Sequence, residues 1–332
     1  MSEVARERVL VQPWSVQAEE FFPLHSFSPE SCPQPKVFVA RSMRSPSSKP
    51  IDWPLIEIHS AFKELCCYLR CQPEIGIDTE FKSKELCLIQ VSCQESAWLI
   101  DSKSVGDLTP FFSILKSEKT IKIFHACRAD IEHLHRAANN IVDIQVLAAY
   151  ANFGAQLSYK DLVKELLGIQ LTKTETLSDW SKRPLTEKQK EYAAEDVKHL
   201  SACYEKLLEQ LKGTDRLAWA LEDCQSLCKE TPANKGPSDL DFTQEKMRNL
   251  MKLLKDKKEA IAKELNLHKS LVCSEPLLKL LIVAWLSGKA EATSFPARLQ
   301  GWRAKHVVAQ LKSVFDEWQR LLDFPPLSLS RL

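Results

Sequence analysis

The chain has 332 residues, 44% hydrophobic and 27% charged, which is the composition of a globular protein long enough for two modest domains. Its 45 basic and 44 acidic residues nearly cancel, so the net charge neither indicates nor excludes a nucleic-acid partner. The 11 cysteines are odd in number and scattered, which favours reduced thiols over a disulfide scaffold. No apolar stretch approaches the ~20 residues of a membrane span. We expect a monomeric cytosolic protein with no membrane partner. An organellar targeting signal in the first fifty residues is the alternative.

The first half of the chain predicts a mixed sheet. Residues 1–50 are rich in proline and serine and predict a poorly ordered arm. An apolar pattern of helical spacing from Ile56 to Leu69 predicts a helix that ends before Pro73. Strand-like segments over 75–81, 86–93 and 97–101 have connections too short for crossover helices, which predicts an antiparallel meander.

Helices and strands then alternate. A helix through 111–115, a strand over 121–125, a helix from about 129 and a strand at 141–142 predict parallel strands added to the meander. Thr186 and Gln189 have the spacing of a capping box, and the helical pattern after them runs unbroken to Gly213. The expected fold is therefore α/β, a mixed sheet flanked by helices over residues 51–213 that closes with one long helix.

A second domain follows. The polar segment from Lys229 to Asp241 contains two prolines and a glycine, so we expect a linker region over residues 214–241. Helical patterns over 242–265, 276–286 and 304–322 predict a small all-helical domain over residues 242–325. Trp285 and Trp302 are expected to be core residues rather than stacking platforms.

Acidic residues in three segments are candidates for chemistry. The period of two in the strand over 75–81 places Asp78 and Glu80 on one face. An isolated pair of this kind usually lies on a solvent-exposed face without a function. On the predicted long helix, Asp196 lies at the edge of the apolar stripe, and Tyr192 lies one turn earlier. A carboxylate turned toward the core must be paired, protonated or bound to metal, and a structural partner for Asp196 is an equal alternative. Asp130 follows a strand end, where sites of α/β sheets gather, but a helix-start aspartate is also common.

Oxygen ligands without histidine or cysteine favour Mg²⁺ or Mn²⁺ over zinc. Two such ions ~4 Å apart can activate a water and stabilise the leaving oxygen of a phosphodiester. The chemistry that this set of residues suggests is phosphodiester hydrolysis.

Three segments resemble, in order and spacing, the exonuclease motifs of the ribonuclease D family, the DEDDy branch of 3′ to 5′ exonucleases. They are Asp78-Thr79-Glu80-Phe81, residues 125–130 (HACRAD) and residues 192–196 (YAAED). Residues 178–186 and 143–145 also look like family signatures, and the agreement covers roughly residues 73–211. Residues 242–322 resemble, more weakly, the helical HRDC domain, most clearly at residues 301–303 (GWR).

The resemblance implies a ribonuclease-H-like fold and a 3′ to 5′ exoribonuclease with two divalent ions, Mg²⁺ or Mn²⁺. It implies the release of 5′-mononucleotides from RNA with a free 3′ end, in the processing of tRNA-like or other structured precursors. Tyr192 would orient the attacking water, and the implied metal ligands are Asp78, Glu80, Asp130 and Asp196. Three further positions match the family but are expected to support the site without binding metal: His125, Gln90 and Asp143.

Candidate RNA contacts near the site are Phe81, Trp180, Lys182 and Arg183, with Lys173 beyond them. In the second domain the candidates are Lys246, Arg248, Lys252 and Lys255, although lysine runs on helices are more often solvated faces. The connection from Phe81 to Glu85 is shorter than in many family members, so contacts near the 3′ end are expected to differ. Two rival functions stay open, a DNA exonuclease, which differs in contacts to the 2′-hydroxyl, and a catalytically silent RNA-binding module. The complete set of five site positions argues against the second.

Overall fold

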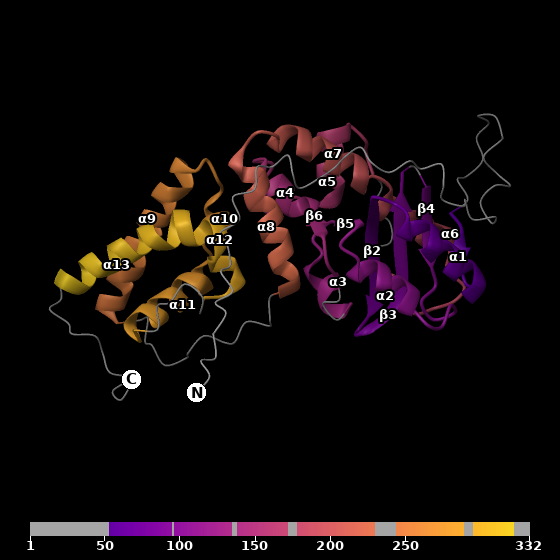
Figure 1. Cartoon of the computed structure of the whole chain (residues 1–332), viewed down its shortest axis with the longest axis horizontal. Coiled ribbons are helices and arrows are strands. Elements are labelled where there is room, and N and C mark those ends of the chain that lie inside the picture. Colours follow the sequence, from indigo (N-terminus) through magenta and orange to yellow (C-terminus); the bar gives the residue numbers. More distant parts are fainter. Residues whose placement is uncertain are drawn as a thin grey trace, which may run out of the picture. The chain divides into compact units, whose positions relative to one another are not determined.

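The computed structural model of the chain describes residues 53–94, 96–134, 138–171, 178–229, 244–288 and 295–321. The arm expected over residues 1–50 lies outside these ranges. A six-stranded sheet with helices around it is followed in the chain by a set of helices (Figure 1). None of the helices in these ranges has the length and the hydrophobicity of a membrane-spanning segment.

The strand order in the sheet is β1-β4-β3-β2-β5-β6. Strands β2, β3 and β4 form the predicted antiparallel meander, while β1 pairs with β4, β5 with β2 and β6 with β5 in parallel. The mixed sheet is therefore confirmed. Of these six strands only β1 was not predicted, because a strand of two residues is too short to show an alternation of apolar and polar side chains. The strands are β1 (Leu55–Ile56), β2 (Glu74–Lys82), β3 (Glu85–Cys93), β4 (Ser96–Ile100), β5 (Ile121–Phe124) and β6 (Ile141–Asp143).

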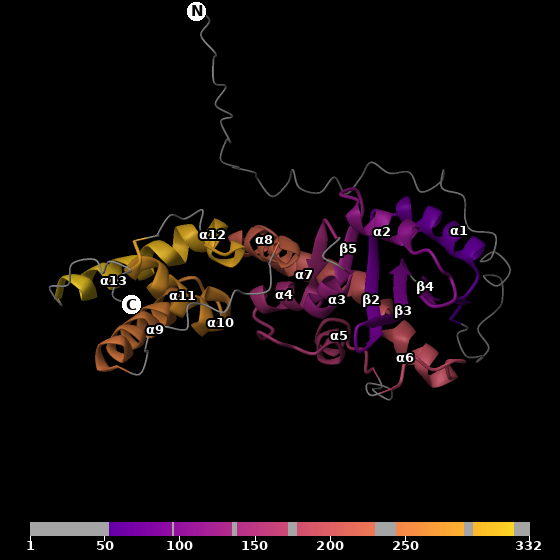
Figure 2. The ribbon, with the colours of Figure 1, turned by 90° about the horizontal axis from the view of Figure 1, so that it is seen from below.

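Helices cover both faces of the sheet. One core joins the sheet to α1 (His59–Arg70), α2 (Thr109–Lys116) and α3 (Arg128–His133). The other core joins the sheet to α4 (Ile144–Tyr150), α5 (Tyr159–Leu167), α6 (Glu187–Lys198) and α7 (Leu200–Leu211). Figure 2 shows α1 and α2 on one side of the strands and α5 and α6 on the other.

Strand β2 has the predicted alternation. Ile75 and Ile77 lie in the core under α1 to α3, whereas Gly76 faces α7. A Cβ atom at Gly76 would lie 2.3 Å from Ser92 Oγ and 3.0 Å from Leu200 Cδ1. Glycine at this position lets α7 approach the strand closely, and it leaves Asp78 and Glu80, two and four residues on, on the side of α6 and α7.

The single long helix predicted over residues 187–213 is wrong, because the chain forms α6 and α7 with a break at His199. The start is as predicted, since Thr186 Oγ1 accepts a hydrogen bond from the Gln189 N–H at 3.2 Å. At the break, the backbone N–H of His199 donates to the hydroxyl of Tyr159 on α5 at 3.1 Å. A tertiary hydrogen bond therefore interrupts a pattern that looks continuous in sequence.

The linker expected over residues 214–241 is wrong in its first half, where α8 (Asp215–Lys229) forms. Ala220 and Cys224 are buried in the core under α4 to α7. The Gln225 side chain donates to the backbone carbonyl of Ile141 on β6 at 2.9 Å. Helix α8 thus packs on the core of the sheet domain, and its Asp223 also forms an ion pair with Arg303. Residues 230–243 lie outside the described ranges.

The described residues from 244 onward are helical, as predicted. The helices are α9 (Glu245–Glu264), α10 (Lys269–Val272), α11 (Glu275–Leu286), a 3₁₀ turn (Ala297–Leu299), α12 (Gly301–Arg303), a π turn (Ala304–Val308) and α13 (Ala309–Leu321). Trp285 and Trp302 are both buried, as expected for core residues.

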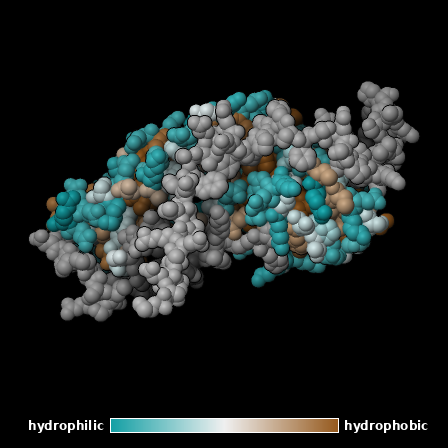
Figure 3. All heavy atoms as spheres, in the orientation of Figure 1, coloured by the Kyte–Doolittle hydropathy of each residue, from teal (hydrophilic) through white to brown (hydrophobic). Residues whose placement is uncertain are grey.

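On the face of the molecule shown in Figure 3, hydrophilic side chains cover most of the described surface and hydrophobic areas are small.

Candidate active site

Three carboxylates from two elements converge beside the sheet. Asp78 and Glu80 come from β2, and Asp196 comes from α6. One carboxylate oxygen of each residue lies within 4.8 Å of the others. All three side chains are half-buried, so the group is reachable from solvent but partly shielded from it. We call these three residues the acidic cluster.

Asp130 reaches the same strand from the first turn of α3. Its carboxylate accepts a short hydrogen bond from the hydroxyl of Thr79, the residue between Asp78 and Glu80. Asp130 lies outside the group of three mutually close oxygens. Its charge nevertheless raises the pKa of both Asp78 and Glu80. The structure therefore brings all four predicted acidic residues to one end of β2.

The cluster is electrostatically costly without a cation. Burial, followed by the charges of Asp196 and Asp130, raises the pKa of Glu80 to about 8. Burial and the same kind of repulsion raise the pKa of Asp78 well above its usual value. Carboxylates that repel one another in a shielded place are stabilised in their ionised form by a divalent cation, and hard oxygen donors suit Mg²⁺ or Mn²⁺.

Gln90 supplies an independent sign that the site is completed by something outside the chain. It lies opposite Asp78 on β3, and its side chain is fully buried. Neither atom of its amide has a hydrogen-bond partner. Native proteins keep few such atoms, because each unpaired buried polar group costs about 1 to 3 kcal/mol. An unpaired amide beside the acidic cluster fits a site that binds a hydrated cation.

Asp143 fixes the turn that leads into α3. Its carboxylate accepts hydrogen bonds from the backbone N–H groups of Ala126 at 2.9 Å, Cys127 at 3.0 Å and Gln145 at 2.9 Å. His125 Nε2 lies 3.0 Å from the backbone carbonyl of Leu157. These contacts give both side chains a supporting part, and the Asp143 contacts hold the loop just before Asp130.

Tyr192 lies on α6 one turn before Asp196, on the stripe that the sequence predicted. Its ring is half-buried and packs near the ring of Trp180, with the centroids 6.1 Å apart and the planes at 37°. Phe81, directly after Glu80, stacks on the His133 ring at 4.0 Å. His133 was not among the predicted site residues, and no local sequence pattern distinguishes it.

The candidate RNA contacts fall into two groups. Trp180 is 4% exposed and Arg183 is ion-paired with the buried Asp101, so both make contacts within the protein, and their contact with RNA stays a prediction. Lys182 is exposed, and Lys173 lies outside the described residues. On α9, Lys246, Arg248 and Lys252 are exposed, while Lys255 pairs with Glu275 at 2.8 Å.

Residues 55–212 match the family model of a 3′ to 5′ exonuclease. The chain is 38% identical over 194 residues to ribonuclease D of Pseudomonas paraeruginosa, covering 54% of this chain and 51% of that protein. It is 41% identical over 169 residues to ribonuclease D of Granulibacter bethesdensis, covering 48% of this chain and 43% of that protein. The matched part thus spans about half the length of these curated relatives.

Among solved structures, the chain is similar to Escherichia coli RNase D, described as "an exoribonuclease involved in structured RNA processing". The TM-score is 0.72 at 21% identity, over 80% of this chain and 99% of that one. At this identity the likeness shows the fold, and it extends beyond the exonuclease domain. The sequence matches show that residues 55–212 are similar to the 3′ to 5′ exonuclease domain of ribonuclease D, and the structural likeness shows that the chain shares the fold of that protein.

Proposed function

We propose that the protein is a 3′ to 5′ exoribonuclease that releases 5′-mononucleotides one at a time from RNA with a free 3′ end. The observation that carries the proposal is the convergence of Asp78, Glu80 and Asp196 within 4.8 Å in a 3′ to 5′ exonuclease domain. A face that merely met water would not gather three half-buried carboxylates against their mutual repulsion.

The acidic cluster and Asp130 would hold two divalent ions, Mg²⁺ or Mn²⁺. When bound, such ions supply a nucleophilic water at neutral pH and stabilise the charge that develops on the leaving oxygen. The chain's own part is to hold the three carboxylates of the acidic cluster within 4.8 Å of one another. Thr79 keeps Asp130 in place through its hydroxyl, and Asp143 keeps the preceding loop in place.

Tyr192 would orient the attacking water through its hydroxyl. The α6 helix carries it one turn from Asp196, so the hydroxyl and the carboxylate act on the same region. Packing against Trp180 restricts the ring. A restricted hydroxyl contributes by positioning, which is worth more when the geometry is fixed before substrate binds.

RNA is the favoured substrate because the curated relatives are named ribonuclease D. Structured precursors, including tRNA-like ones, would be the physiological class, as the description of the Escherichia coli protein suggests for that enzyme. The helical domain would bind RNA upstream of the 3′ end, with exposed Lys246, Arg248 and Lys252 on one helix as candidate phosphate contacts.

The test uses RNA and DNA oligonucleotides of one sequence, each labelled at the 5′ end. We expect a ladder that shortens from the 3′ end of the RNA with Mg²⁺ or Mn²⁺, no ladder with a chelator, and slower loss of the DNA. A 3′-terminal phosphate should block the reaction if the end is the site of attack. Internal cuts, a preference for DNA or binding without shortening would each overturn the proposal.

A further inference from the structure

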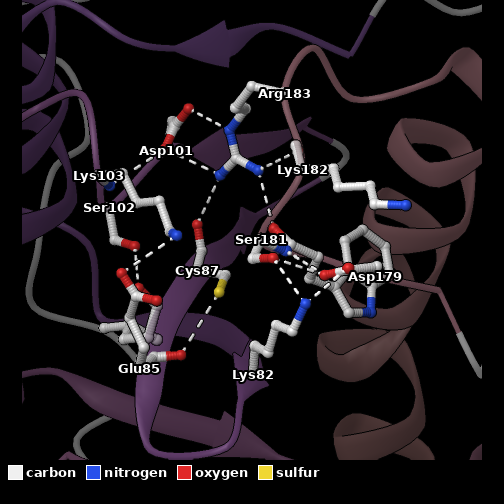
Figure 4. A network of polar contacts seen from close by, with 12 residues as sticks. Lys82, Glu85, Cys87, Asp101, Ser102, Lys103, Asp179, Ser181, Lys182 and Arg183 are labelled. Carbon is white, nitrogen blue, oxygen red and sulfur yellow. Dashed lines mark hydrogen bonds and ion pairs between the residues drawn. The ribbon is translucent and has the colours of Figure 1, made fainter.

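Residues 178–184 form a loop that is tied to the sheet just before α6 begins. Arg183 is at the centre of the network that Figure 4 shows. Its guanidinium donates to the two carboxylate oxygens of Asp101, at 2.5 and 2.9 Å. It also donates to the backbone carbonyls of Cys87, Trp180 and Lys182, at 2.8 Å each.

These contacts use the whole guanidinium. A guanidinium has five N–H donors, and the hydrogen bonds of Arg183 account for all of them. Burial alone would raise the pKa of Asp101, but the hydrogen bonds and the charge of Arg183 outweigh it and hold that pKa below its usual value. No donor of Arg183 is left for a phosphate oxygen, so this arginine cross-links its own loop to β3 and to the residue after β4.

The other end of the loop is tied to β2. Lys82, the last residue of β2, donates to the Asp179 carboxylate at 2.6 Å and to Ser181 Oγ at 3.1 Å. The second oxygen of Asp179 accepts from the Ser181 N–H and hydroxyl, at 3.1 and 2.6 Å. The hydrogen bond from Lys82 holds the pKa of Asp179 well below its usual value. We call Lys82, Asp101, Asp179, Ser181 and Arg183 the clasp.

Trp180 lies between two residues of the clasp in the chain, Asp179 and Ser181. Its carbonyl accepts from Arg183, and its ring packs near Tyr192 while the residue is only 4% exposed. The N-cap of α6, Thr186, comes three residues after Arg183. The clasp therefore fixes both the ring against which Tyr192 packs and the point where its helix starts. The side chain of Lys182 points away from the network in Figure 4.

We propose that the clasp sets the position of the Tyr192 hydroxyl over the acidic cluster, by holding Trp180 against the Tyr192 ring. This rests on the proposed function, which gives Tyr192 its part. Asp101, Asp179 and Arg183 are then positioning residues, and the clasp contributes rate rather than affinity for RNA.

The test begins with Asp179→Asn, which weakens the partly exposed end of the clasp and leaves the buried Asp101–Arg183 pair intact. We expect kcat to fall about tenfold with KM and Mn²⁺ affinity unchanged, since a misplacement of about 1 Å can cost ~10² in rate. The matched control is Lys103→Met, which breaks the neighbouring Lys103–Glu85 pair, 3.1 Å long, without touching the loop. The control should keep the wild-type kcat.

The decisive step combines Asp179→Asn with Tyr192→Phe. If the clasp acts through the Tyr192 hydroxyl, Asp179→Asn should cost nothing more once that hydroxyl is gone. Losses that multiply, or an Asp179→Asn variant with wild-type kcat, would overturn the inference.

Hydrogen exchange tests the clasp independently of whether the protein proves to be an exoribonuclease. Amides of residues 178–192 should exchange faster in Asp179→Asn, while those of α9 should not change. Unchanged exchange over residues 178–192 would refute the clasp even if the enzyme proved active. If wild type shortened no RNA, the proposed function would fail, and the exchange measurement would still decide whether the clasp orders this segment.

Discussion

Asp78 on β2 lies directly opposite Gln90 on β3, in the antiparallel register of the two strands. The Gln90 amide is fully buried and has no hydrogen-bond partner in the chain. A polar group in this state lowers the free energy of unfolding unless something outside the chain satisfies it. The unpaired Gln90 amide thus lowers the free energy of unfolding at the end of the sheet that carries the acidic cluster.

Replacing Gln90 with methionine tests this cost. The Gln90→Met side chain keeps a similar length without the amide, so the metal-free protein should gain about 1 to 3 kcal/mol in its free energy of unfolding. Urea unfolding in the presence of a chelator measures the gain. Ser92→Ala is the matched control on the same strand, since Ser92 Oγ donates to the Val197 carbonyl at 2.7 Å. That variant should lose about 1 kcal/mol, and a destabilised Gln90→Met would show that the amide is satisfied.

The sequence predicted the parts of the site that depend on local period. Alternation along β2 placed Asp78 and Glu80 on one face, and the helical stripe placed Tyr192 beside Asp196. Such a period says which way a side chain faces within its own element. It does not say which distant residue it meets, and so the pairs Thr79–Asp130, Phe81–His133 and Asp101–Arg183 could not be found.

The errors in the sequence-based fold have the same origin. A hydrogen bond from His199 to Tyr159 interrupts the helical pattern of residues 187–213, and that partner lies 40 residues away. Helix α8 was missed because the prolines and glycine after Lys229 dominated the interpretation of residues 214–241. Its buried positions Ala220, Cys224 and Leu227 do follow a helical spacing. Arg183 was expected to contact RNA because it is a basic residue near the predicted site, whereas in the structure it donates to Asp101 and to the backbone carbonyls of Cys87, Trp180 and Lys182.

The pH dependence of stability should contain a contribution from Lys122. Its side chain is fully buried on β5, and burial lowers the pKa of Lys122 from 10.5 to about 8. Between these values the unfolded state binds more protons than the folded state, so this residue makes stability rise with pH across that window. Below pH 8 its contribution is unfavourable, and each pKa unit is worth about 1.4 kcal/mol.

Lys122→Met isolates the effect. The difference in unfolding free energy between wild type and the variant, measured in urea at pH 7, 9 and 10, should move in favour of wild type as the pH rises. A difference that stays constant would mean that the pKa of Lys122 is the same in both states.

Truncation should depend on α8. A chain ending at Gly213 would remove Cys224 and Ala220 from the core and should lose stability or fail to fold. A chain ending at Lys229 keeps α8 and should retain a folded exonuclease domain with near-normal rates on short single-stranded RNA, but weaker binding of long RNA. Circular dichroism melting and single-turnover cleavage of both chains check this. A stable chain ending at Gly213 would show that the core of the sheet domain does not depend on α8.

Tyr192→Phe should separate positioning from metal binding. The change removes one hydroxyl from a ring that stays packed near Trp180, so folding and RNA affinity should hardly change. Loss of a group that positions or transfers protons typically costs about 10² to 10⁴ in rate. We expect that loss in kcat, with KM and Mn²⁺ affinity as in wild type. Near-normal turnover would remove Tyr192 from the mechanism.

In the proposed function, the acidic cluster binds the metal ions with which the protein hydrolyses RNA from its 3′ end. The most direct test is single-turnover cleavage of a 5′-labelled oligoribonucleotide by wild type and by Asp196→Asn, across a Mn²⁺ titration. The substitution keeps the size of the side chain and removes one of the three charges that lie within 4.8 Å. We predict a metal-dependent ladder for wild type and no ladder for Asp196→Asn at any concentration that saturates wild type. Cleavage by Asp196→Asn at the wild-type rate and with the same Mn²⁺ midpoint would show that Asp196 is not a metal ligand.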